Sequence, residues 1–407
     1  MRYVIIGNSA AGIFAAEEIR RLDREGQIEI ISDETYPAYA RCLTSYYLSG
    51  GISDEKMFIR PADFYARNNL TLHNGEKVVR IDPAEKKVVS GKGQSYDYDK
   101  LLIATGSSPF MPDIPGIKTK GVFGLRTLED AKNIREYAKP GRRAVVVEGS
   151  FVSVEAAYAL LKAGLTVSNI VSSGQILLTA LDSEAASLVA NKLTSEGLEI
   201  KYFTDVSEIV EKGGEVAGVK LTTGEFLPAD VVVIGKGTIP NTGFLQGSGI
   251  VVDNGIAVDE YLQSNVPDIY AAGDVAQGND IVLGVKRINA IWPNAAEQGA
   301  AAGKTMAGLK VKYDGSIGMN SIDFFGLSTI SAGQGKAEGD SYEVVKLFPG
   351  QGQYLRLVFK EDKLAGYILV GQTHRAGILT ELIRGQIPLG KLKEELTQGQ
   401  IRQRILS

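Results

Sequence analysis

The sequence has few of the side chains that perform chemistry without a cofactor. It contains one cysteine, Cys42, which excludes an internal disulfide, a Cys-x-x-Cys redox pair and a cysteine-ligated cluster within the chain. It has two histidines, His73 and His374, so a histidine-built metal site or catalytic triad is not expected, and we predict no metal. Chemistry in this chain therefore has to come mainly from a bound cofactor.

The sequence also lacks a charge excess and a long apolar run. A formal net charge of −4 provides no basic field for phosphate backbones, so nucleic acid is not an expected partner. No stretch approaches the roughly 18 apolar residues that a membrane helix needs. The first predicted strand begins at Arg2, which leaves no room for a signal peptide. We expect a cytoplasmic protein without a membrane span.

What the sequence does contain is an alternation of strands and helices that occurs twice. Apolar strands are predicted at 2–6, 29–31 and 101–104, and residues 121–244 repeat the alternation. A connector rich in proline and glycine, 109–116, separates the two parts. The sequence therefore predicts an α/β protein with two similar domains.

The N-terminal strand runs into a turn with two fingerprint glycines. In Gly7-Asn8-Ser9-Ala10-Ala11-Gly12 the first and third glycines of a dinucleotide-binding turn are present, and Ser9 occupies the second position. The N–H groups and the dipole at the start of the next helix favour a phosphate. Asp33 and Glu34 follow the second strand, where a carboxylate accepts ribose hydroxyls, and either acid fits this role.

The second copy of this pattern has lost its glycines. Glu148, Ser150 and Ser153 occupy the three fingerprint positions. Repulsion between a carboxylate and a pyrophosphate charge about 4 Å away costs up to about 4 kcal/mol of binding free energy at an effective dielectric constant of about 20. The acid expected after the following strand is replaced by Ser172-Ser173. We expect nicotinamide binding to be weakened or lost.

Two features of the same part of the chain favour the alternative, in which NADH still binds through other backbone amides. Glu155 is retained on the helix that follows the turn. Gly235-Lys236-Gly237, with Pro240-Asn241, keeps a strand-end pattern that closes such a domain. The sequence leaves this choice open.

Several further segments carry a family resemblance. They are Ala104-Thr105-Gly106, Tyr270-Ala271-Ala272-Gly273-Asp274, Trp292-Pro293-Asn294-Ala295-Ala296-Glu297-Gln298-Gly299, and Tyr36-Pro37-Ala38-Tyr39-Ala40-Arg41 with Leu48-Ser49-Gly50. The order and spacing of the first three resemble those of the FAD-dependent pyridine nucleotide-disulfide oxidoreductases. The last resembles the branch of NADH oxidases, coenzyme A disulfide reductases and rubredoxin or nitrite reductases. The resemblance covers essentially the whole chain.

The resemblance implies two Rossmann-like domains and a C-terminal α+β domain. An FAD-binding domain formed by 1–112 and 245–317 is interrupted by an NAD(P)H-binding-like domain at 113–244, and an interface domain follows at 318–407. The last domain is expected to form a homodimer or to dock a partner. FAD is the implied cofactor, whereas NAD(P)H remains an open question.

The resemblance also assigns residues to each site. The FAD site comprises Gly7, Ser9, Ala10, Ala11, Gly12, Asp33, Glu34, Arg41, Val79, Ala104, Thr105, Gly106, Gly273, Asp274, Trp292 and Ala295. The degenerate NAD(P)H site comprises Glu148, Gly149, Ser150, Ser153, Glu155 and Gly237. Arg41 suits a phosphate because its guanidinium donates two hydrogen bonds at a fixed geometry. The long helix near Pro293 is expected to direct its N-terminal N–H groups at the flavin.

Cys42 has two interpretations. It falls where NADH oxidases and coenzyme A disulfide reductases carry a single redox cysteine, which would make it catalytic. However, Tyr39-Ala40-Arg41-Cys42-Leu43 is more similar to the rubredoxin and nitrite reductase pattern, in which this position is only apolar. A free cysteine is often a small buried hydrophobic residue.

The resulting prediction is an FAD-containing electron-transfer oxidoreductase that exchanges electrons with an iron–sulfur protein or a partner redox enzyme. One alternative is a working NAD(P)H-dependent reductase or oxidase with ferredoxin, rubredoxin, a disulfide or oxygen as acceptor. Another is a non-enzymatic scaffold subunit that FAD stabilises.

Overall fold

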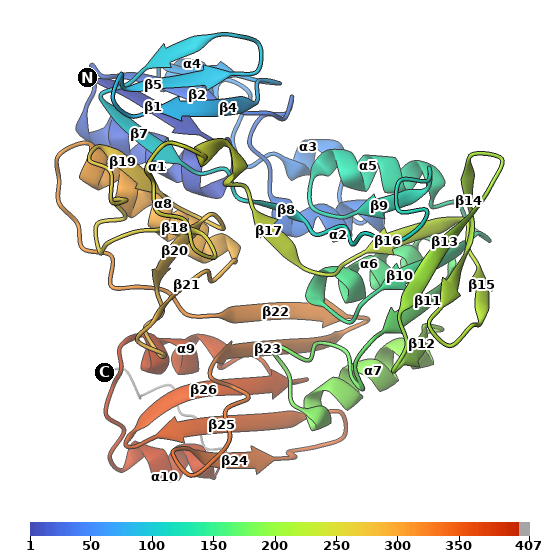
Figure 1. The fold of residues 1–407 in the computed structure, drawn as a ribbon. Coiled ribbons are helices and arrows are strands. Elements are labelled where there is room, and N and C mark those ends of the chain that lie inside the picture. The colour runs from blue at the N-terminus through green and yellow to red at the C-terminus, as the bar shows by residue number, and fades with distance from the viewer. Residues whose placement is uncertain (399–407) are drawn as a thin grey trace. The chain divides into compact units, whose positions relative to one another are not determined.

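The computed structural model describes residues 1–398, which form two compact units. The first consists of Met1–Leu43, Ser53–Ser108 and Thr238–Gly318. The second consists of Thr44–Ile52, Pro109–Gly237 and the chain from Met319 on. Each unit contains a five-stranded parallel sheet, which confirms the predicted α/β fold with two Rossmann-like parts (Figure 1). The three-domain boundaries stay a prediction.

The sheet of the first unit is buried on both faces. Its strand order is β19-β7-β1-β2-β3. The strands are β1 (Arg2–Ile6), β2 (Gln27–Ile31), β3 (Leu70–His73), β7 (Lys100–Ile103) and β19 (Ile269–Ala271). Val4, Ile5 and Leu102 are almost inaccessible to solvent. Such continuous apolar strands are typical of a parallel sheet that is covered on both sides, so the predicted strands at 2–6, 29–31 and 101–104 are confirmed.

Two helices pack closely against each other beside this sheet. They are α1 (Ala10–Leu22) and α8 (Trp292–Met306), and the predicted long helix near Pro293 is thereby confirmed. A Cβ on Gly299 would lie 2.1 Å from the carbonyl oxygen of Ala11, and one on Gly303 would lie 2.5 Å from that of Ala15. The two helix backbones therefore approach so closely that only glycine fits at these positions.

The remaining elements of the first unit are short. They are β4 (Val78–Asp82), β5 (Lys87–Ser90), β6 (Ser95–Asp97), β18 (Ile256–Ala257), β20 (Ala276–Asn279), β21 (Lys286–Arg287), α3 (Asp54–Met57), α4 (Phe64–Arg67), η1 (Arg41–Leu43) and η2 (Gly243–Leu245). The strands β8 (Ser107–Pro109) and β17 (Thr238–Pro240) pair where the chain passes between the two units.

The second unit repeats the α/β pattern around strand order β12-β11-β10-β16-β9. Its sheet consists of β9 (Val122–Gly124), β10 (Arg143–Val147), β11 (Thr166–Val171), β12 (Glu199–Tyr202) and β16 (Val231–Ile234). Its helices are α2 (Thr44–Leu48), α5 (Leu128–Tyr137), α6 (Phe151–Lys162) and α7 (Ser183–Ser195). The same unit contains an antiparallel sheet of β13 (Val206–Lys212), β14 (Glu215–Leu221) and β15 (Phe226–Pro228).

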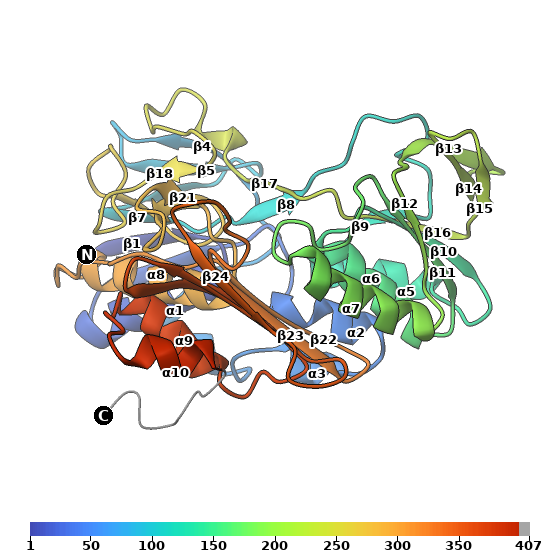
Figure 2. The ribbon, with the colours of Figure 1, turned by 90° about the horizontal axis from the view of Figure 1, so that it is seen from below.

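The C-terminal part of the second unit is an antiparallel sheet with order β22-β23-β26-β25-β24. Its strands are β22 (Met319–Phe324), β23 (Leu327–Gly333), β24 (Glu343–Leu347), β25 (Tyr354–Lys360) and β26 (Lys363–Val370). Helices α9 (Ala376–Arg384) and α10 (Leu392–Thr397) lie beside this sheet in Figure 2. None of the helices within residues 1–398 combines the length and the apolar character that crossing a membrane requires.

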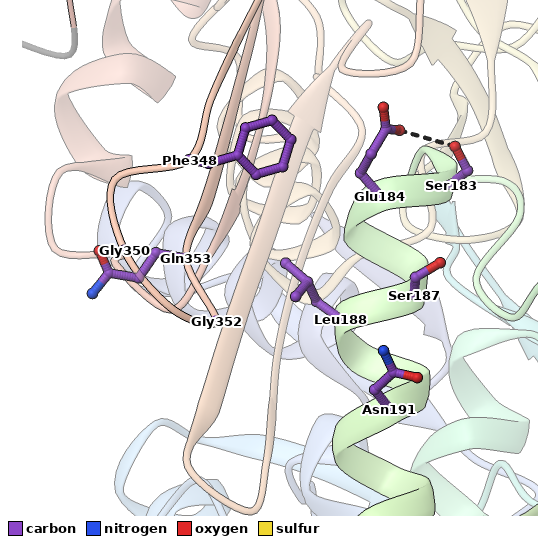
Figure 3. Close-up of a pocket in the computed structure, with 9 residues that line it drawn as sticks. All are labelled: Ser183, Glu184, Ser187, Leu188, Asn191, Phe348, Gly350, Gly352 and Gln353. Carbon is purple, nitrogen blue, oxygen red and sulfur yellow. Dashed lines mark hydrogen bonds between the residues drawn. The ribbon is translucent and has the colours of Figure 1, made fainter.

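A buried ionic network joins α7 to this antiparallel sheet. Asp182 caps the start of α7, and it accepts hydrogen bonds from Tyr354 and, at 3.0 Å, from Arg356 of β25. Beside it, a shallow hollow of about 390 Å³ separates α7 from the loop that contains Phe348 (Figure 3). The network and the hollow both lie within the second unit.

Candidate functional site

The first turn has the geometry of a dinucleotide cradle. Gly7 has a φ of +122°, and a Cβ there would lie 2.1 Å from the carbonyl oxygen of Ala104. A Cβ on Gly12 would lie 1.9 Å from the carbonyl oxygen of Gly7. Both fingerprint positions therefore require glycine, one for the bend and the other for the close approach of helix and turn.

Positive charge lies at the start of α1. Ser9 precedes the helix, and its hydroxyl does not cap the helix amides. Instead, the Arg41 Nε donates to the Ser9 Oγ at 3.1 Å. A helix N-terminus with an uncapped first turn and an adjacent guanidinium suits a pyrophosphate. The residues of the first turn therefore fit FAD.

The structure distinguishes the two acids that the sequence left open. Glu34 is half-buried and accepts hydrogen bonds from the Tyr39 hydroxyl, at 2.6 Å, and from Arg41. Asp33 is exposed. Glu34 therefore lies beside the phosphate-binding turn, where a carboxylate can accept ribose hydroxyls.

Two other predicted segments converge on the same turn. A Cβ on Gly273 would lie 3.3 Å from the Ala11 Cβ and 3.6 Å from the Ala295 Cβ. The end of β19 therefore meets the starts of α1 and α8. Asp274, partly buried, comes directly after this meeting point. Ala10 and Ala11 are buried in the first turn of α1.

The remaining predicted residues occupy different places in the first unit. Thr105 donates its hydroxyl to the Asn241 carbonyl at 2.9 Å, next to Gly106. Trp292 is half-buried at the beginning of α8. Val79 lies on β4 in the antiparallel sheet with an exposed side chain, so no role of that side chain in the turn is evident.

Sequence reasoning did not assign a role to two buried amides of α8. Gln298, 3% exposed, accepts a hydrogen bond from the Gly273 N–H at 2.8 Å. Asn294 donates to the Ile317 carbonyl at 3.0 Å. Both lie in the 292–299 segment that carries the family resemblance. An amide side chain on a helix needs a hydrogen-bond partner once it is buried, and this need was the signal that could have indicated their role. Gln298 therefore holds the backbone of the turn at Gly273.

The second turn retains the backbone shape but places a carboxylate in it. Glu148 has a φ of +84°, the left-handed region that favours glycine. Its carboxylate accepts from the Ser172 Oγ at 2.9 Å and pairs with the Lys236 Nζ at 3.4 Å. Lys236 also pairs with Asp205 at 2.6 Å. The Glu148 charge is therefore held at the turn, and it lies beside the end of β11, where the sequence lacks the expected acid.

Two serines fill the rest of this turn. The Ser150 Oγ accepts from the Ser153 N–H at 3.2 Å and donates to the Gly235 carbonyl at 2.6 Å. The buried Ser153 Oγ donates to the Val147 carbonyl at 2.9 Å. The start of α6 is therefore capped by its own hydroxyl, unlike the start of α1. Gly149 is buried beside this cap, and Gly237 is exposed with a φ of +92°.

Glu155 faces α2 from the middle of α6. Burial raises the pKa of the Glu155 carboxyl to about 7, although a hydrogen bond with Ser45 opposes this shift. The folded chain therefore keeps the Glu155 proton at pH values where an exposed glutamate has already lost it.

This pKa predicts a pH-dependent stability. The unfolded chain loses the Glu155 proton above the ordinary pKa of 4.5, whereas the folded chain keeps it until about pH 7. The free energy of unfolding should therefore fall between these two pH values, by up to about 3 kcal/mol from this group. Urea unfolding at pH 5 and pH 7.5 measures the fall. Glu155→Gln should remove it, whereas Glu136→Gln, an exposed control, should not. An equal fall in the free energy of unfolding between the two pH values in both variants would contradict the prediction.

Cys42 lies in η1 and is exposed. The interpretation of this residue as a small buried hydrophobic side chain is therefore wrong for this structure. Its redox role stays a prediction.

The chain thus combines a parallel sheet that has a glycine-lined turn, a second parallel sheet whose corresponding turn carries Glu148, and a C-terminal antiparallel sheet. The glycine-lined turn before α1 is typical of proteins that bind a dinucleotide. Residues 1–299 match the family model for pyridine nucleotide-disulphide oxidoreductases, and residues 319–387 match that for the rubredoxin NAD+ reductase C-terminal domain. The chain belongs to the pyridine nucleotide-disulphide oxidoreductase family. The predicted family, the FAD cofactor and the class of FAD-dependent oxidoreductase are confirmed.

Relatives extend along nearly the whole chain. The assimilatory nitrate reductase electron transfer subunit of Bacillus subtilis is 33% identical over 98% of this chain, which spans 51% of that protein, about half its length. The epsilon subunit of NADH-dependent phenylglyoxylate dehydrogenase from Aromatoleum evansii is 33% identical, over 96% of this chain and 93% of its own. Putidaredoxin reductase, in its covalent complex with putidaredoxin, has a TM-score of 0.88 at 26% identity, covering 96% of this chain and 95% of its own.

Proposed function

We propose that this chain is an FAD-containing electron-transfer subunit that exchanges electrons with an iron–sulfur protein or a partner redox enzyme and binds nicotinamide weakly or not at all. The observation that carries the proposal is the Glu148 carboxylate, which hydrogen bonds hold inside the second turn. A pyrophosphate placed there would meet a negative charge and a helix start that Ser150 already caps.

The first turn supplies the other half of the proposal. Bound FAD provides the redox chemistry that this sequence lacks. Arg41 and the first turn of α1 would hold its pyrophosphate, and Glu34 would accept its ribose hydroxyls. Gln298 would keep the Gly273 turn in place beside the cofactor.

The names of relatives support a protein partner. One relative is an electron transfer subunit, and the solved putidaredoxin reductase is joined to putidaredoxin. A homodimer through the C-terminal sheet and a location in the cytoplasm stay predictions.

The second candidate function is a working NAD(P)H-dependent reductase. Two observations favour it: the name of the phenylglyoxylate dehydrogenase subunit includes NADH dependence, and this chain retains Glu155.

Anaerobic stopped-flow reduction tests the proposal. The FAD-loaded protein is mixed with NADH, with NADPH and with a chemically reduced ferredoxin, and the flavin absorbance is followed. We expect slow, non-saturating reduction by both nicotinamides and rapid reduction by the ferredoxin. Rapid, saturable bleaching by NADH or NADPH would refute the proposal, and a flavin that no donor reduces would favour the scaffold alternative.

Replacing the carboxylate tests the physical cause. Glu148→Gly removes the charge and suits the positive φ, so NADH should bind at least about tenfold more tightly, which is about 1.4 kcal/mol of the repulsion. Glu361→Gly is the matched control, because it also removes a glutamate at positive φ, 55°, in the turn between β25 and β26. Titration of NADH against flavin fluorescence measures both. An unchanged affinity in Glu148→Gly would show that the carboxylate does not limit binding.

A further inference from the structure

A hollow in the second unit has two apolar side chains that face each other. It lies between α7 and the loop from β24 to β25, and its volume is about 390 Å³. Leu188 points from α7 toward the loop, and Phe348 points from the loop toward α7 (Figure 3). Phe348 is 64% exposed, although its ring packs against the buried Tyr354 with 5.1 Å between the ring centroids. A hollow of this size beside an exposed ring is typical of a binding surface.

The polar groups of the hollow suit a peptide. Ser187 and Asn191 are exposed on α7, one helical turn apart. The Asn191 carboxamide offers a donor and an acceptor, which is the pair that a peptide bond requires. Gly350 and Gly352 belong to the opposite wall, and because they have no side chain they leave room for a second backbone. An extended segment that places one aliphatic side chain between the two apolar side chains would therefore fit.

One end of the hollow carries a negative charge. The Glu184 carboxylate lines it, and a hydrogen bond from Lys346 lowers the pKa of this carboxyl to about 2. Asp182, Glu184 and Glu338 meet Lys346 and Arg356 in one ionic network. Three carboxylates against two cations leave one negative charge, so a segment with a positive side chain is favoured at this end.

The C-terminal sequence of the chain has the required chemistry. Residues 399–407 lie outside the described residues, and their sequence contains Arg404 followed by Ile405 and no acid. The described chain leads to them through α10, whose Lys393 pairs at 2.6 Å with Glu343, the first residue of β24. From there β24 extends about 17 Å to the loop of the hollow. An extended segment of this length spans up to about 30 Å, so it can reach the hollow.

We propose that the hollow binds the C-terminal segment 399–407 of the same chain, with the Arg404 guanidinium at Glu184 and the Ile405 side chain between the two apolar side chains. A guanidinium suits this end because it donates two hydrogen bonds to a carboxylate at a fixed geometry. The contact joins the C-terminal end of the chain to α7 and involves neither dinucleotide turn. It is therefore independent of the response to nicotinamides.

Disulfide cross-linking in the full-length, FAD-loaded protein tests this proposal. Cys42→Ser removes the native thiol from all samples, and Asn191→Cys is combined with Ser407→Cys. Under mild oxidation with copper phenanthroline we expect an intrachain disulfide in at least about tenfold higher yield than for Thr223→Cys with Ser407→Cys, since binding raises the effective concentration of the two thiols. Thr223 is an exposed control in the turn between β14 and β15 of the same unit. Mass spectrometry and non-reducing electrophoresis measure the yield.

Two tail variants test the assigned contacts. Ile405→Asp and Arg404→Glu should each lower the yield at least about fivefold, because one places a charge between apolar side chains and the other places a carboxylate beside Glu184. An excess of the synthetic peptide 399–407 should lower the yield as well. Equal yields for the Asn191 and Thr223 pairs, or a yield that neither tail variant changes, would overturn the proposal. A disulfide that joins two chains would overturn the assignment to the same chain.

Discussion

Gly7→Ala is expected to yield protein with little or no bound FAD. The new Cβ would lie 2.1 Å from the carbonyl oxygen of Ala104, which is backbone at the end of β7 and cannot rotate away. The φ of +122° is also strained for alanine. Together these effects should destabilise the turn by at least about 3 kcal/mol. The ratio of flavin to protein absorbance after purification, and urea unfolding of the same samples, measure the loss.

Gly93→Ala is the control for Gly7→Ala, because it keeps the strain of a positive φ but introduces no clash. Gly93 has a φ of +80° in the turn between β5 and β6, and a Cβ there would enter open space. This variant should lose only about 1 kcal/mol and keep its flavin. If Gly7→Ala also retained full flavin content, the turn would be more adaptable than its geometry indicates, and its role as a rigid cradle would be wrong.

Arg356→Met is expected to cost about 3–5 kcal/mol of the free energy of unfolding. The Arg356 side chain is fully buried and donates to Asp182 at 3.0 Å and to the Ala337 carbonyl at 3.0 Å. Methionine fills the space but leaves the Asp182 carboxylate, 6% exposed, without its buried cation. Urea unfolding followed by circular dichroism measures the change.

Two further variants test whether the loss of stability comes from the unpaired charge of buried Asp182. Lys346→Met removes the more exposed partner of Asp182, at 3.8 Å, and should cost about 1 kcal/mol or less. Adding Asp182→Asn to Arg356→Met should recover part of the loss, since no unpaired charge then remains. If the single Arg356→Met variant were as stable as Lys346→Met, Arg356 would not be needed to neutralise Asp182.

The predictable parts of this protein are those with a local cause. Apolar runs predicted β1, β2 and β7, because a strand buried on both faces is mainly apolar and does not alternate between apolar and polar residues. Gly7 and Gly12 predicted the first turn, since its backbone geometry excludes a Cβ at either position. The Pro293 segment predicted α8, where proline suits the start of a helix.

The parts that sequence reasoning missed depend on distant partners. The replacement of Gly by Glu148 was evident, but its carboxylate could have pointed away from the turn. Lys236, 88 residues later, and Ser172 hold it there. Similarly, Asp33 and Glu34 were equivalent until the contacts of Arg41 and Tyr39 distinguished them.

The sequence by itself therefore determined the family, the α/β architecture and one intact and one altered dinucleotide turn, because these follow from local backbone and packing requirements. Only the tertiary structure decided where the charges lie. Arg356 and Asp182 are 174 residues apart, and no spacing rule predicts such a pair. The same holds for Glu148 and Lys236, because side chains from separate strands become neighbours only when the parallel sheet brings the strand ends together.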